Sequence, residues 1–199
     1  MKAEEKRKSL TSWLFNPFLF WSGEKLFLAG VLAILLHIPM AMVFNIRFGG
    51  ALDMHVGPEA PALAVIVTDI LIAWMVMFLF LYAAIRLLGK TARLIDIAGA
   101  VGVARLPLLL SSIPVYYTAP DIETPEEVLA LQGSEMGWLI AGALLSLPFF
   151  VWFIVLLFNA FKVNSNQKGW KLGVGFVGAI VVAEIASLFL NRYFTGLLS

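Results

Sequence analysis

The sequence contains no cysteine and only two histidines, His37 and His55. Without cysteine there can be no disulfide framework, no thiol catalysis and no cysteine-ligated zinc or iron–sulfur site. Two histidines are too few for a histidine-rich metal cage. We therefore expect no metal and no other cofactor.

Charge is scarce as well. Only 14% of the 199 residues are charged, whereas 61% are apolar, and the mean hydropathy is +0.92. A soluble domain carries roughly 25% charged and 45–50% apolar residues, so this chain has too much apolar surface for one water-soluble core. The net charge is +1, and the basic residues do not form the stripe that nucleic-acid binding requires. The composition predicts a membrane protein that binds no nucleic acid.

Five stretches are long enough to cross a bilayer, which takes about 20 mostly apolar residues. Their apolar runs are continuous, whereas the strands of a membrane barrel alternate, so we expect an all-α polytopic transmembrane helical bundle. The third stretch is the weakest, since it contains Arg105, Pro107 and Pro114. The predicted spans cover residues 26–44, 62–88, 95–117, 138–161 and 172–190, within one membrane domain of residues 26–199.

Lysine and arginine fall mainly on one side of the predicted spans. The opposite side carries only Arg47 and Arg192. Because short loops rich in these residues stay in the cytoplasm, we expect the N-terminus inside and the C-terminus outside, in a multi-pass protein of the inner cell membrane. The cytoplasmic set is Lys2, Lys6, Arg7, Lys8, Lys25, Arg86, Lys90, Arg93, Lys162, Lys168 and Lys171.

Two segments outside the spans have patterns of their own. Residues 1–25 combine basic and aromatic side chains, which predicts a cytoplasmic segment at the membrane interface, broken near Asn16-Pro17. A docking site for a partner is the alternative interpretation of this segment.

In an acidic outer loop, residues 124–127 read Thr-Pro-Glu-Glu, which is typical of a helix start. This pattern predicts a short outer helix near residues 125–132.

Two patterns resemble enzyme motifs without their required context. Residues 173–178 spell G-x-G-x-x-G, but they begin a predicted span and do not follow a strand. We interpret these glycines, like Gly99 and Gly102, as small residues that allow close helix packing. Asp69 and Asp96 lie roughly 20 Å apart in depth, so they cannot share a proton as the carboxylates of an aspartyl protease do. We expect that the chain is not an enzyme.

A set of ionisable residues lies inside four different predicted spans: His37, Asp69, Arg105 and Glu184. A lone charge at the bilayer centre costs at least roughly 2.5–3.5 kcal/mol. Two interpretations stay open, a structural network that ties helices together and an ion or proton path. Because arginine keeps its proton, we expect Arg105 to pair with Asp69 or Glu184. Asp96 is expected to pair with Arg93 at the inner interface.

Two further stretches complete the pattern. Residues 88–92 (LGKTA), a short glycine-containing polar loop, lead to residues 104–108 (ARLPL) in the third span, and residues 152–168 form a helix followed by a short polar loop. Together with Asn16-Pro17 ahead of the first span, these stretches resemble the Yip1-domain family of five-span membrane proteins, in its bacterial type. The resemblance covers most of the chain.

Eukaryotic Yip1 proteins act in vesicle traffic and bind prenylated Rab-type GTPases, and bacterial members share their layout. The resemblance implies a non-enzymatic scaffold or a role in membrane organisation, with the lipid bilayer and a membrane protein or a second copy as partners. The alternative is a small transporter or channel that uses the four buried ionisable residues. A water-accessible cavity at these residues would favour conduction, whereas pairing in a dry bundle would favour the scaffold.

Overall fold

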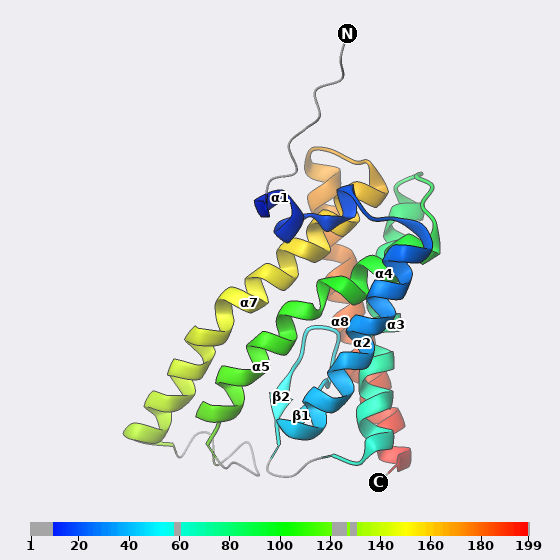
Figure 1. Ribbon diagram of the computed structural model, residues 1–199. Coiled ribbons are helices and arrows are strands. Elements are labelled where there is room, and N and C mark those ends of the chain that lie inside the picture. The colour runs from blue at the N-terminus through cyan, green and yellow to red at the C-terminus, as the bar shows by residue number, and fades with distance from the viewer. Residues whose placement is uncertain (1–9, 58–60, 121–126, 128–130, 199) are drawn as a thin grey trace.

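The computed structural model describes residues 10–57, 61–120, 127 and 131–198 (Figure 1). In this part of the chain, five helical segments are long and apolar enough to cross a membrane, which confirms the predicted all-α bundle. They are α2 (Gly23–Val43), α3 (Leu63–Leu87), α4 with α5 (Leu94–Ala104 and Leu106–Thr118), α7 (Ser134–Ser165) and α8 (Trp170–Leu198). Two short elements, α1 (Leu10–Phe15) and the 3₁₀ turn η1 (Pro17–Leu19), precede them.

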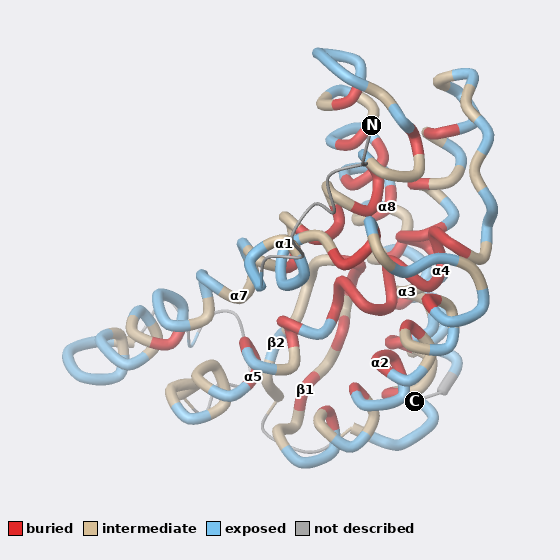
Figure 2. The backbone as a smooth tube through the Cα atoms, turned by 45° about the horizontal axis from the view of Figure 1, so that its top comes forward, coloured by how far each residue is buried: buried red, intermediate tan, exposed pale blue. Residues whose placement is uncertain are grey.

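The helices pack in pairs around the third span. α2 packs on α4, α3 on α8 and α5 on α7. α4 is the most deeply buried helix, and the beginning of α7 is largely exposed (Figure 2). α1 lies across one end of the bundle, and α8 finishes at the opposite end (Figure 1).

α2 and α4 cross closely because both carry glycine at the crossing point. A Cβ atom added to Gly99 would lie 2.6 Å from the Leu26 carbonyl oxygen, and one added to Gly102 would lie 2.5 Å from that of Gly30. These distances leave no room for a side chain against the facing backbone. The prediction that Gly99 and Gly102 serve close packing is therefore confirmed.

The same interpretation is wrong for part of α8. A Cβ atom at Gly173 or Gly178 would meet nothing within 4 Å, whereas one at Gly175 would lie 2.9 Å from Leu88 Cδ1. Of the three glycines, only Gly175 faces another element closely, so the other two lie on parts of the α8 surface that contact no neighbour. Residues 173–178 lie within one continuous helix, so no strand precedes the G-x-G-x-x-G pattern.

The third span is two helices joined at Arg105. Pro107 has no N–H group to continue the hydrogen-bonding ladder of α4, and it occupies the first turn of α5, a position where proline is tolerated. The N–H of Arg105 is shared between the carbonyl oxygens of Val101 and Gly102. This break leaves the Arg105 side chain at the middle of a span.

Several predicted boundaries need correction. α7 and α8 are longer than predicted, because their ends carry polar residues that a hydropathy pattern excludes but through which a helix continues.

The predicted pair of Asp96 with Arg93 is confirmed. Arg93 Nε lies 2.7 Å from Asp96 Oδ2, and Asp96 raises the pKa of the Arg93 guanidinium. The same carboxylate accepts the N–H of Gly23 and so fixes the start of α2. The helix predicted near residues 125–132 lies largely outside the described residues.

Candidate functional site: a hairpin held inside the bundle

The segment between α2 and α3 folds back into the bundle as a hairpin. β1 (Ile46–Arg47) pairs antiparallel with β2 (His55–Val56), and the N–H of Gly57 donates to the carbonyl oxygen of Asn45 over 2.9 Å. Figure 1 shows the hairpin entering from the end where α8 finishes, with its tip pointing toward the junction of α4 and α5. The segment lies between the first two predicted spans, where the sequence predicted no regular element.

The tip of the hairpin, residues 48–52, is buried at Phe48, Gly50 and Ala51 and half-buried at Gly49 and Leu52. Phe48 is 2% exposed and Ala51 is fully buried, and the tip contacts Arg105, which lies 11 residues into the third span. At 1.5 Å per residue this is about 16 Å from the end of that span. Irregular backbone at such a depth needs protein partners for its polar groups, since lipid offers none.

One face of α8 supplies most of these partners. The N–H of Leu52 donates to Glu184 Oε2 over 2.6 Å, and the N–H of Ala51 donates to Ser187 Oγ over 2.7 Å. Asn191 Nδ2 donates to the Phe48 carbonyl oxygen over 2.9 Å. Residues three and four apart lie on the same side of a helix, so these side chains form a polar stripe, the α8 stripe, that holds the tip.

Arg105 binds the tip from the other side. Its Nη1 donates to the carbonyl oxygen of Ala51 over 2.9 Å, and its guanidinium lies over the ring of Phe48, 5.4 Å from the centroid. The Ala51 carbonyl and the Leu52 N–H belong to one peptide group. That peptide therefore connects the Arg105 cation to the Glu184 carboxylate, and the charge of Glu184 also acts on Arg105 through space.

Asp69 and His37 reach the hairpin as well. Asp69 accepts from Arg47 Nε over 2.6 Å, and the His37 ring packs edge-on against Phe48, with 5.3 Å between centroids. His37 Nδ1 lies 2.8 Å from the Ala33 carbonyl oxygen. A carbonyl can only accept, so Nδ1 carries the proton.

The four ionisable residues singled out by the sequence therefore come from four spans and each contact the hairpin. The expected ion pair between Arg105 and Asp69 is wrong, because Arg47 occupies the Asp69 carboxylate. No direct ion pair joins Arg105 to Glu184 among the described residues, because a peptide group stands between them. Within the same described set, four buried side-chain atoms have no hydrogen-bond partner: His37 Nε2, Arg105 Nε and Asn191 Oδ1 near the hairpin, and Asn16 Oδ1.

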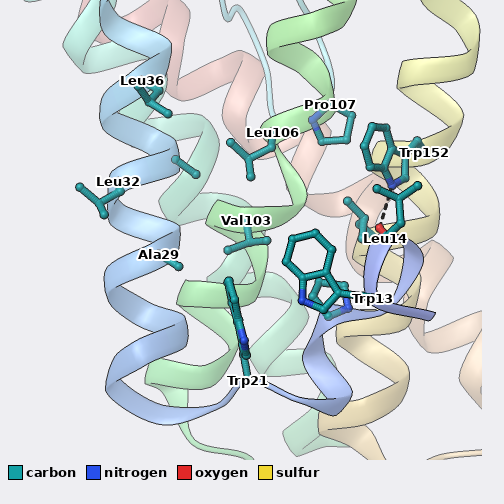
Figure 3. A pocket seen from close by; sticks show the side chains of 13 residues that line it. Trp13, Leu14, Trp21, Ala29, Leu32, Leu36, Val103, Leu106, Pro107 and Trp152 are labelled. Carbon is teal, nitrogen blue, oxygen red and sulfur yellow. Dashed lines mark hydrogen bonds between the residues drawn. The ribbon is translucent and has the colours of Figure 1, made fainter. Parts of the chain in front are cut away.

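A second feature is an apolar cavity of about 380 Å³ on the side of the bundle, the lateral groove. Its walls come from α2, from the α4–α5 junction and from α7, and Trp13 and Trp21 close one end (Figure 3). Trp152 Nε1 donates to the Leu14 carbonyl oxygen over 3.1 Å, which attaches α1 to α7 beside the groove. The groove is not lined by Asp69, Arg105 or Glu184.

The sequence matches the model of the Yip1 domain over residues 3–190. The chain belongs to the Yip1 family. The matched region contains the hairpin, Arg105 and Glu184, and it ends one residue before Asn191. No curated protein and no solved structure matches the chain.

Sequence reasoning missed three side chains of the polar site in this Yip1-family protein, Arg47, Ser187 and Asn191. Arg47 looked like an ordinary loop cation, and Asn191 lies one residue beyond the predicted end of the fifth span. A signal was nevertheless present, since Glu184, Ser187 and Asn191 repeat at intervals of three and four residues. The backbone groups of the hairpin tip could not have been found, because no side-chain pattern marks them.

Proposed function

We propose that this Yip1-family membrane protein is a non-enzymatic scaffold with a role in membrane organisation or trafficking. The observation that carries the proposal is that His37, Asp69, Arg105 and Glu184 each contact one hairpin. Buried charges in transporters face a pathway or a water-filled cavity. Here they bind protein groups of the chain, as expected of residues that maintain a rigid shape.

The scaffold's partner is a membrane protein or a second copy, and its location is the inner cell membrane with the N-terminus inside. The distribution of lysine and arginine supports this orientation. The structure supplies a surface that suits such a role, because the first half of α7 extends from the bundle with Trp138, Leu144 and Leu147 exposed.

A flux assay separates the scaffold from the alternative, a small transporter or channel. The purified protein is placed in liposomes that contain a pH-sensitive dye, and a proton gradient and then a potassium gradient are imposed. The scaffold predicts dissipation at the rate of protein-free liposomes, for the wild type and for Glu184→Gln. Flux that is present in the wild type and lost in a folded Glu184→Gln variant would contradict the scaffold and favour conduction.

A further inference from the structure

The lateral groove has the character of a hydrocarbon site. None of its 13 lining residues is charged. Its floor is formed by Val103 and Pro107 at the break of the third span, and Leu32 and Trp152 stand on either side (Figure 3). An apolar cavity stays empty of water, and empty space forfeits the dispersion contacts that its walls would make with a filling group.

The groove is shorter than one leaflet. It begins under Trp13 and Trp21, and its α2 wall runs from Ala29 to Leu36. At 1.5 Å per residue this wall is about 10 Å long, compared with about 15 Å for half of a typical hydrocarbon core. The groove can therefore hold part of one acyl chain within a single leaflet.

A positive charge stands at the surface end of the same helix face. On α2 the groove is lined by Ala29, Ala33 and Leu36, and Lys25 precedes Ala29 by four residues, so it lies one turn closer to the surface on the same side. Lys25 is exposed. Glu24, its neighbour, is turned by about 100° around the helix.

We propose that the lateral groove binds one acyl chain of a glycerophospholipid, drawn from the leaflet that α1 contacts, with the lipid phosphate beside Lys25. The occupant is hydrocarbon because the walls are apolar and open toward lipid, and it is a phospholipid because the cation stands where a headgroup would lie. α1, held to α7 by Trp152 and Asn159, covers the surface end of the bound chain. The proposal is independent of the scaffold role.

Photolabelling tests the position of the acyl chain. The protein is reconstituted in nanodiscs of phosphatidylglycerol with a trace of phosphatidylglycerol that carries a diazirine on one acyl chain. After irradiation, adducts should concentrate on groove residues such as Leu32 and Trp152, and Leu35, which is exposed on α2 outside the groove, should be labelled weakly. Equal labelling of Leu32 and Leu35 would mean boundary lipid only and would overturn the proposal, as would a groove-to-groove cross-link between two copies.

Matched variants test the groove itself. Ala29→Trp fills the groove and should abolish its adducts, whereas Leu28→Trp places the same ring on the exposed neighbouring position and should preserve them. Leu32→Trp, at the mouth of the groove, replaces Ala29→Trp if that variant fails to fold. Retention of the adducts in the filled, folded variant would overturn the proposal.

The headgroup contact has its own variants. Native mass spectrometry should detect bound phosphatidylglycerol on the wild-type protein, and Lys25→Gln should lose it. Lys168→Gln removes another exposed lysine, in the loop between α7 and α8, and should retain the bound lipid. If the two variants retained phosphatidylglycerol equally, Lys25 would not be part of the lipid-binding site.

Discussion

At the scale of single residues, the structure distinguishes glycines that the sequence presents alike. Gly99 faces backbone atoms of α2, Gly175 faces the flexible end of Leu88, and Gly178 faces open space. A flexible side chain can move aside, whereas the backbone of a packed helix cannot move without separating the two helices. The three positions should therefore respond differently to one and the same substitution.

Substitution of these glycines by leucine should give a graded loss of stability. Gly99→Leu should cost more than the about 1–3 kcal/mol typical of overpacking, because it presses on backbone, and Gly175→Leu should cost less. Gly178→Leu is the matched control and should be neutral or stabilising, since glycine itself weakens a helix by about 1 kcal/mol. The measurement is thermal unfolding in detergent, and equal midpoints for Gly99→Leu and Gly178→Leu would contradict the observed crossing of α2 and α4.

Arg105 and Glu184 offer a second test at the same scale. Arg105→Leu should destabilise the fold by about 1–3 kcal/mol, because it leaves the buried Ala51 carbonyl without its donor. The double variant Arg105→Leu/Glu184→Leu should recover only part of it, because the peptide between Ala51 and Leu52 keeps an unpaired carbonyl and an unpaired N–H. A double-mutant cycle on unfolding measures the coupling. Strict additivity would mean that the peptide does not connect the two charges.

At the scale of elements, the spans were predictable and the hairpin was not. Continuous apolar runs mark α2, α3, α7 and α8 directly, and Pro107 signals the break in the third span. The hairpin escapes this reasoning because its tip, with Gly49, Gly50 and Ala51, is neither long nor strongly apolar. Its place inside the bundle depends on backbone groups meeting the α8 stripe more than 130 residues later, a relation that no local pattern contains.

The candidate site shows the same division. Their position inside apolar spans identified His37, Asp69, Arg105 and Glu184 as residues that need partners, but the sequence could not show which partners they have. Helix rotation decides which side chains meet, and the break at Arg105 changes that rotation within a single span. Arg47 therefore forms the ion pair with Asp69, and Arg105 donates a hydrogen bond to a backbone carbonyl.

Labelling of single cysteines tests the position of the hairpin tip. The chain has no cysteine, so each introduced thiol is unique. Ala51→Cys should resist a membrane-impermeant maleimide applied from either side, because residue 51 is fully buried, whereas Ala62→Cys, exposed just before α3, should react.

Loosening the α8 stripe provides the converse experiment. Adding Ser187→Ala and Asn191→Leu to the Ala51→Cys variant removes two of the groups that hold the tip, so reactivity at residue 51 should rise. Rapid labelling of the Ala51→Cys variant with Ser187 and Asn191 intact would show instead that the tip lies in water.

At the scale of the whole molecule, an odd number of spans places α1 and the end of α8 on opposite sides of the membrane. Fusions of a topology reporter after Lys90 and Lys168 should read cytoplasmic, because the basic residues gather in those loops. Fusions after Pro58 and Glu127 should read external. A cytoplasmic signal at Glu127 would contradict the predicted orientation.

The hairpin also fixes an order of events during synthesis. It leaves the ribosome with α2 and α3, whereas Glu184, Ser187 and Asn191 follow only with the last helix. Until α8 has entered the membrane, the backbone of residues 48–52 lacks the three partners that Glu184, Ser187 and Asn191 supply, and Arg105 alone can bind it. A nascent chain must therefore leave the hairpin in water, or protected by insertion factors, while four spans assemble. Arrival of α8 is then the step that draws the hairpin inward, and a chain that stops short of α8 would expose it to quality-control proteases.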